Sequence, residues 1–182
     1  ERFLSAHAHE IQGGVIEVGD AAYTRQFGGA RVKASDVLHV DESNPAATIV
    51  GDLTCADHIP ASTFDCFVLT QTFQLIYDVR AAIRTVYRIL KPGGVVLATV
   101  PGISQISDDE WGATWYWAFT SLSARRLFEE VFPGDHVEIE AHGNVLAATG
   151  FLQGLAAHEL SPAELNHTDR DYEMLITIRA RK

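Results

Sequence analysis

Continuous apolar runs alternate with amphipathic segments along the 182-residue chain. Short apolar runs are typical of strands that are buried on both faces of a parallel sheet. The runs that predict strands are GVIEV (14–18), RVKASDVLHV (31–40), ATIVGDL (47–53), DCFVLTQ (65–71), GVVLATVP (94–101), HVEIEAH (136–142) and YEMLITIRA (172–180).

Between these runs, apolar residues recur every three or four positions, which is the helical period. Helices are predicted over 78–90, with Asp78 as N-cap and Pro92-Gly93 as the stop, and over 120–132. A third helix over 144–160 is interrupted by glycines, and a capping box at Ser161 and Glu164 follows it. Strands that alternate with helices predict an α/β fold with a doubly wound, mainly parallel sheet.

In such a sheet, ligands bind beyond the carboxyl ends of the strands. Asp36 follows Glu17 by 19 residues, and an acid near that spacing bonds ribose hydroxyls in dinucleotide-type folds. Asp52 can accept a hydrogen bond from the adenine amino group, and Leu53 can pack on the ring. Taken singly, each acid is equally well explained as a turn residue.

Residues 62–102, STFDCFVLTQTFQLIYDVRAAIRTVYRILKPGGVVLATVPG, resemble the fourth strand, the next helix and the LKPGG turn of class I S-adenosylmethionine-dependent methyltransferases of the type 11 kind. VIEVGD is similar to the first motif of that family, and GDLTCADHIPASTFD to its adenine-contacting segment. The resemblance covers 13–140. It implies a seven-stranded Rossmann-like sheet with an antiparallel last strand, S-adenosylmethionine as cofactor, and methyl transfer. The cofactor-binding residues that it implies are Glu17, Gly19, Asp20, Asp36, Val37, Asp52, Leu53, Thr70 and Gln71.

The first motif departs from the family pattern. Two further glycines are expected after Gly19, but this chain has Asp20-Ala21-Ala22-Tyr23. A methyl group at Ala21 hinders the approach of the backbone to a cofactor. The alternative function is therefore a non-catalytic methyltransferase-like binding module of a larger protein. A nicotinamide-dependent dehydrogenase is disfavoured, because Gly-x-Gly-x-x-Gly is absent.

Aromatic residues follow the fifth predicted strand, on the side where a methyl acceptor is expected. Trp115 and Trp117 offer flat apolar faces, and Gln74 is expected to orient the acceptor. The acceptor implied is a small molecule or a glycan, methylated at oxygen. The acids 108–110 are either general-base candidates or a polar turn, and the sequence assigns no catalytic residue.

Composition limits the partners. The formal net charge is -10, and without a basic stripe the sequence argues against a nucleic-acid partner. No apolar run has the length of a membrane span, and the histidines follow no known metal-ligand spacing. Cys55 and Cys66 are expected to be reduced thiols, which favours a cytoplasmic location. Residues 1–182 are expected to form a single domain cut from a longer protein, and the oligomeric state is left open.

Overall fold

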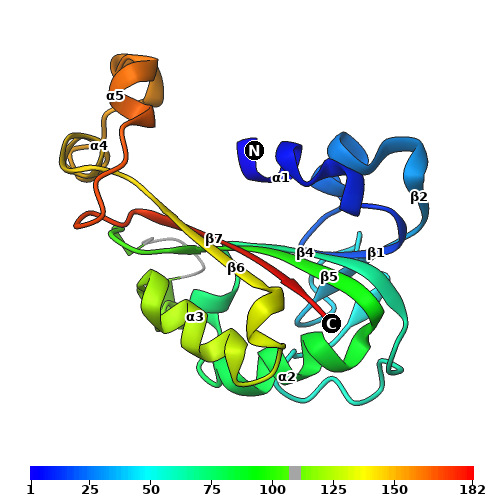
Figure 1. Ribbon diagram of the computed structural model, residues 1–182. Coiled ribbons are helices and arrows are strands. Elements are labelled where there is room, and N and C mark those ends of the chain that lie inside the picture. The colour runs from blue at the N-terminus through cyan, green and yellow to red at the C-terminus, as the bar shows by residue number, and fades with distance from the viewer. Residues whose placement is uncertain (107–111) are drawn as a thin grey trace.

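A computed structural model describes residues 1–106 and 112–182 (Figure 1). One sheet contains seven strands in the order β3-β2-β1-β4-β5-β7-β6. The strands are β1 (Gly13–Val18), β2 (Val32–His39), β3 (Ile49–Val50), β4 (Phe64–Thr70), β5 (Leu90–Pro101), β6 (Val137–His142) and β7 (Leu175–Arg181).

Strands β1 to β5 pair in parallel, and β7 runs antiparallel to both of its neighbours, β5 and β6. The predicted seven-stranded, mostly parallel sheet with an antiparallel last strand is therefore confirmed. Strand β3 is much shorter than the predicted run over 47–53. Its two residues pair with Leu38 and His39 of β2 and form one edge of the sheet.

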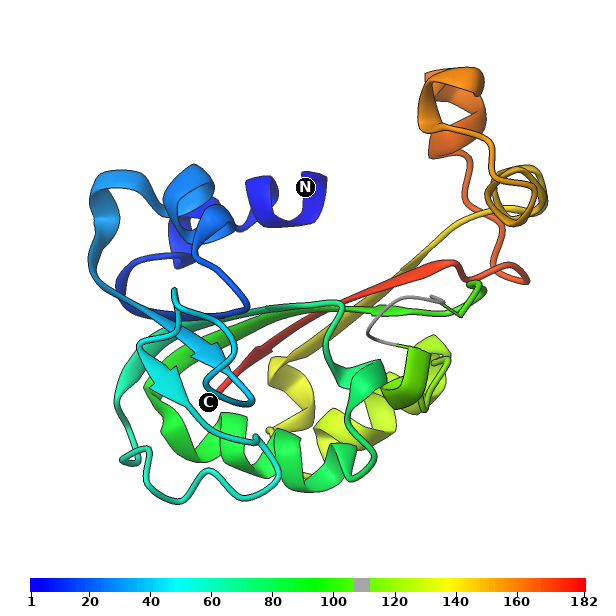
Figure 2. The same ribbon diagram turned by 180° about the vertical axis from the view of Figure 1, so that it is seen from behind.

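Helices cover the two faces of the sheet unequally. The first helical segments and η2 lie on one face, and α2 and α3 lie on the other (Figures 1 and 2). A hairpin of α4 and α5 extends beyond one end of β6 and β7. The α-helices are α1 (Arg2–Ala6), α2 (Val79–Ile89), α3 (Ser121–Glu129), α4 (Val145–Leu152) and α5 (Pro162–Asn166). The short helical turns are η1 (Ala8–Glu10), η2 (Thr24–Gly28), η3 (Gly29–Arg31), η4 (Phe73–Leu75), η5 (Gly112–Thr114), η6 (Gly134–His136) and η7 (Ala157–Glu159).

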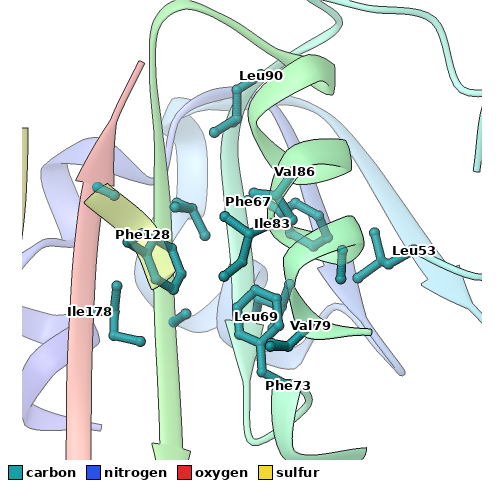
Figure 3. Packing of buried hydrophobic residues seen from close by; sticks show 14 of the residues in the cluster. Leu53, Phe67, Leu69, Phe73, Val79, Ile83, Val86, Leu90, Phe128 and Ile178 are labelled. Atoms are coloured by element: carbon teal, nitrogen blue, oxygen red, sulfur yellow. The ribbon is translucent and has the colours of Figure 1, made fainter. Parts of the chain in front are cut away.

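Helix α2 has the N-cap and the buried apolar face that its sequence predicts. The Asp78 carboxylate accepts a hydrogen bond of 2.9 Å from the backbone N–H of Ala81, which confirms the predicted N-cap. The apolar stripe of Val79, Ile83 and Val86 faces the sheet and belongs to the larger of two buried clusters (Figure 3). The helix ends at Ile89, and β5 begins directly at Leu90, so the helix stops before the predicted Pro92-Gly93 turn.

A smaller buried cluster fills the other face of the sheet. Leu4 and Ile11 from the N-terminal segment pack against Val15, Val68 and Leu97 of the central strands. Of the two glycines that were expected to interrupt the helix over 144–160, only Gly154 does so. Gly150 lies inside α4, whereas Gly154 follows the end of the helix with φ of +81°. In the described part of the chain, no helix is both long enough and apolar enough to cross a membrane.

Candidate cofactor site and acceptor surface

The carboxyl ends of five parallel strands meet at one edge of the sheet, which is where doubly wound folds bind ligands. Backbone contacts connect neighbouring segments at this edge. The N–H of Gly19, after β1, donates to the carbonyl of Leu38 in β2 at 3.0 Å, and the N–H of Gln71, after β4, donates to that of Thr99 in β5 at 2.9 Å. The predicted segments after β1 and β4 therefore lie on one rim.

Glu17 is buried near the end of β1, at 3% exposure. Its carboxylate accepts hydrogen bonds from the backbone N–H groups of Tyr23 at 3.1 Å and Thr24 at 2.7 Å. Burial raises the pKa of Glu17 above its usual value, although these N–H donors act in the opposite direction. The side chain therefore fixes the loop after β1 by satisfying N–H groups at the start of η2.

Only one position in this loop needs the conformational freedom of glycine. Gly19 has φ of +86°, and a side chain there would meet no atom within 4 Å. Tyr23 has a right-handed helical backbone with φ of -70°, and Ala21 has no positive φ. Asp20 accepts a hydrogen bond of 2.6 Å from the N–H of Ala22. The missing glycines therefore cause no backbone strain at Ala21 or Tyr23.

The predicted ribose acid, Asp36, does not lie at the end of its strand. It pairs with Ile16 in the interior of β2, three residues before the strand ends at His39. Its carboxylate accepts a hydrogen bond of 2.8 Å from the Thr48 hydroxyl. Val37, also predicted as a contact, is buried, and its N–H donates to the same hydroxyl at 2.9 Å. The predicted placement of both residues at the rim is wrong, because β2 continues beyond them to His39, within the predicted run over 31–40.

Asp41 occupies the position that was predicted for Asp36, just beyond the end of β2. Its side chain is 64% exposed and accepts a hydrogen bond of 2.9 Å from the N–H of Ser43. Hydrogen bonds from Ser43, together with the nearby His39, lower the pKa of Asp41, so the carboxylate is ionised at neutral pH. The sequence signal for this turn was the Asp-x-Ser spacing, which favours a hydrogen-bonded turn after a strand.

Asp52 follows β3 and remains at the rim, where its carboxylate accepts a hydrogen bond of 2.8 Å from the N–H of Thr54. Leu53 was predicted to cover an adenine ring. Its side chain is instead 4% exposed and packs within the larger buried cluster (Figure 3). The turn after β3 therefore presents the acid outward and the leucine inward.

Gln71 lies just after β4 in a left-handed conformation, with φ of +48°. Its side-chain amide donates to the Thr99 hydroxyl at 3.2 Å, and its carbonyl accepts from the Gln74 amide at 2.8 Å. A left-handed conformation is unusual for a residue other than glycine, and such strain persists only where neighbouring contacts hold it. Thr70 and Gln71 thus stay at the predicted rim, held by the end of β5.

Gln74 was predicted to face the acceptor, but only 2% of it is exposed. Its backbone carbonyl accepts from the N–H groups of Tyr116 at 2.8 Å and Trp117 at 3.3 Å. Its side-chain oxygen has no hydrogen-bond partner within residues 1–106 and 112–182. The backbone of Gln74 therefore anchors the loop that carries Tyr116 and Trp117. The prediction that the Gln74 side chain faces the acceptor is wrong, because this side chain is buried.

An exposed cluster of three rings forms beside this anchor. We call Tyr77, Tyr116 and Trp117 the aromatic cluster. The Tyr77 ring stacks on Trp117, with centroids 6.0 Å apart, and meets Tyr116 edge-on at 5.4 Å. The Trp117 indole N–H donates to the carbonyl of Ile76 at 3.0 Å. Tyr77 was missed by the sequence analysis, and Trp115 is only half-buried beside the cluster.

Within residues 1–106 and 112–182, no group of three or more His, Cys, Asp or Glu side chains is arranged to hold a metal ion. In β6, the His142 ring nitrogen Nε2 lies 3.1 Å from the Thr177 hydroxyl. The acids 108–110, the alternative base candidates, lie outside the described residues.

Comparisons with known proteins agree with this geometry. Residues 18–98 match the family described as Methyltransferase domain. No curated protein sequence matches the chain.

Solved structures share the fold at low sequence identity. An S-adenosylmethionine-dependent methyltransferase from Archaeoglobus fulgidus has a TM-score of 0.65 at 11% identity, covering 98% of this chain and 91% of that one. One from Mesorhizobium loti has a TM-score of 0.63 at 15% identity, covering 99% and 98%. Phosphoethanolamine N-methyltransferase 2 from Haemonchus contortus has a TM-score of 0.64 at 16% identity, covering 100% of this chain and 52% of that one. The strand order is that of the fold these S-adenosylmethionine-dependent methyltransferases share, and the family match over residues 18–98 runs from the end of β1 into β5 of that fold.

Proposed function

We propose that this domain methylates a hydroxyl group of a small molecule or a glycan that packs against the aromatic cluster. The observation that carries this proposal is the exposed stack of Tyr77 and Trp117, which is connected through Gln74 to Gln71 at the carboxyl end of β4. Flat aromatic faces suit the apolar faces of sugars and related rings. The Gln71 amide can hydrogen-bond to a hydroxyl beside them.

The residues at the rim fit the cofactor. Gly19 leaves open space where a side chain would project, and Glu17 fixes the loop that follows. We assign the backbone of Gly19 and Asp20 to the amino-acid part of S-adenosylmethionine, Asp41 to its ribose and Asp52 to its adenine. An ionised carboxylate can accept hydrogen bonds from both ribose hydroxyls.

When bound, S-adenosylmethionine supplies an activated methyl group on a sulfonium. The chain contributes alignment and the exclusion of water, which are the principal catalytic effects in an in-line displacement. Gln71 is held rigidly by Thr99 and Gln74, so its side chain can orient the acceptor with little loss of conformational freedom. The aromatic cluster covers the acceptor from the β4 side.

An amine is the second candidate acceptor. Aromatic faces also attract cations, and the net charge of -10 favours a cationic ligand. An experiment with a panel of acceptors separates the two. Release of S-adenosylhomocysteine would be measured with neutral sugars, phenols and primary amines at matched concentrations.

Turnover with the sugars or phenols, and none with the amines, is the expected result. Turnover with amines alone would show that the methylated atom is nitrogen and not oxygen. Cofactor binding without turnover on any acceptor would contradict the proposal. The two free cysteines, one of them buried, support a reducing compartment for this reaction.

A further inference from the structure

A second concave surface lies at the opposite edge of the sheet from the cofactor rim. It encloses 670 Å³, which is within the range of pockets that bind small molecules. Its walls are the first residues of β1, β2, β4 and β5 and the end of β7, near the C-terminus marked in Figure 1. We call this surface the basic cleft. Its charged lining residues are Arg31, Lys33, Lys91, Arg181, Glu10 and Asp65.

Both carboxylates of the basic cleft are already paired. Glu10 accepts from Arg179 in a two-pronged contact with both distances at 2.7 Å, and it also contacts Arg181. Asp65 accepts from the Lys91 ammonium and from the N–H of Gly14, each at 2.7 Å. Each acid therefore already has a cationic partner, Arg179 for Glu10 and Lys91 for Asp65.

Two cations of the cleft keep unused donors. Lys33 is exposed, and no hydrogen bond or ion pair within the described ranges involves its ammonium group. Arg31 donates through one nitrogen only, to the carbonyls of Ala8 and Phe27. Lys33 lies close enough to help lower the pKa of Asp65. Like charges gathered around one hollow repel each other, and an anion bound among them relieves that repulsion.

Glycines shape the floor of the cleft. Gly13 has φ of +68°, and a side chain there would approach the Asp65 carboxylate within 2.4 Å. Gly94 likewise has no room for a side chain, because the Lys91 carbonyl lies 2.9 Å from the position that a Cβ would take. The floor is therefore closely packed, with Gly94 buried and the Asp65 carboxylate beside Gly13, while the cations that line the cleft come from separate segments of the chain.

We infer that the basic cleft binds a small phosphate-bearing anion, independently of methyl transfer. Donors that converge from separate strands suit the tetrahedral oxygens of a phosphate better than the planar oxygens of a carboxylate. Because the overall charge is -10, the rest of the surface repels anions, and the cations of the basic cleft attract them to this one place.

The test is a nuclear magnetic resonance titration of the full chain with inorganic pyrophosphate at low ionic strength. We expect amide shifts at Gly14 and Gly94, and none at Gly19 or Asp41. Lys33→Glu should weaken pyrophosphate binding by about tenfold or more, because one charge-assisted contact becomes repulsive. Arg126→Glu makes the same change of charge on an exposed site of α3, and it should leave binding within about twofold.

Several outcomes would overturn the inference. One is the absence of saturable pyrophosphate binding, or amide shifts confined to the cofactor rim. Another is an equal loss of pyrophosphate affinity in Lys33→Glu and Arg126→Glu. A third is that succinate, which carries carboxylates only, binds as tightly as pyrophosphate. A lipid headgroup is tested with vesicles of phosphatidic acid in phosphatidylcholine. Because the cleft is concave, we expect no sedimentation with them, and sedimentation would contradict a soluble ligand. The affinity for S-adenosylmethionine, measured with and without pyrophosphate, should be unchanged.

Discussion

The carboxylate of Glu17 lies 2.7 Å from the backbone nitrogen of Thr24 and accepts its hydrogen bond inside the protein. Replacing Glu17 with alanine leaves this N–H and that of Tyr23 without their acceptor. We expect the free energy of unfolding to fall by about 1–3 kcal/mol, which is the cost of an unsatisfied buried donor. Urea denaturation measures it. A change near zero would mean that other groups satisfy these donors.

The pH dependence of this effect has a definite sign. Burial raises the pKa of Glu17, so its ionised form is less favourable in the folded chain than in the unfolded one. Its contribution to stability is therefore largest below the ordinary value of 4.5 and declines as pH rises through the folded pKa. The stability advantage of wild type over Glu17→Gln should shrink as pH rises from 4.5 through the folded pKa.

Glu10 should show the opposite dependence. Burial alone would raise the pKa of Glu10, but the hydrogen bonds and charge of Arg179, with Arg181 and His7, outweigh it and lower the pKa. Its stabilisation is present above 4.5 and is lost as pH falls through the folded pKa. Because Glu10→Gln leaves Arg179 without a buried countercharge, we expect a loss of about 3–5 kcal/mol near neutral pH.

Two controls test the Glu10–Arg179 pair. Glu138→Gln removes the exposed partner of Arg179 and should cost less than about 1 kcal/mol. The double variant Glu10→Gln/Arg179→Gln should be more stable than the sum of the single effects predicts. Additive losses would show that the two side chains act separately.

Cofactor affinity should depend on Asp41 more than on Asp36. Asp41→Asn removes an exposed, ionised acceptor after β2 and should weaken S-adenosylmethionine binding by about 1.5–3 kcal/mol, measured by calorimetry. Asp36→Asn makes the same change of charge inside β2, where the Thr48 hydroxyl already donates to the carboxylate. A larger loss of S-adenosylmethionine affinity in Asp36→Asn than in Asp41→Asn would show that Asp36 makes the ribose contact.

The aromatic cluster should affect the acceptor and leave the cofactor unaffected. Tyr77→Ala and Trp117→Ala each remove one ring of the exposed stack. We expect a rise in acceptor KM of about fivefold or more, equivalent to about 1 kcal/mol, with the affinity for S-adenosylmethionine unchanged. Leu152→Ala, an exposed apolar residue on α4, is the matched control and should change neither. Equal loss of both affinities would indicate a packing role instead.

The sequence predicted the fold well because its signals were local. The segment from β4 to β5 contains an apolar run, a capped amphipathic helix and a second apolar run, and each is visible within a few residues. The confirmed Ser161–Glu164 capping box is equally local.

Parts of the candidate site were misplaced because they depend on contacts between distant segments. Asp36 was chosen by its spacing from Glu17, whereas it pairs with Ile16 inside β2 and the strand runs on to His39. Gln74 is buried because the aromatic loop, about forty residues later, folds over it. Tyr77 stands alone in the sequence and joins its partner rings only through that same folding.

The position of β7 in the sheet determines when the sheet can be completed during synthesis on the ribosome. Residues 175–181 are the last of the seven strands to be synthesised, yet they lie between β5 and β6. Until they emerge, β6 has no strand to pair with, and the edge of β5 stays open to other chains. A nascent chain that stalls before Leu175 would therefore expose two unpaired edges at once, so completion of the sheet and release from chaperones should coincide with the end of translation of this strand.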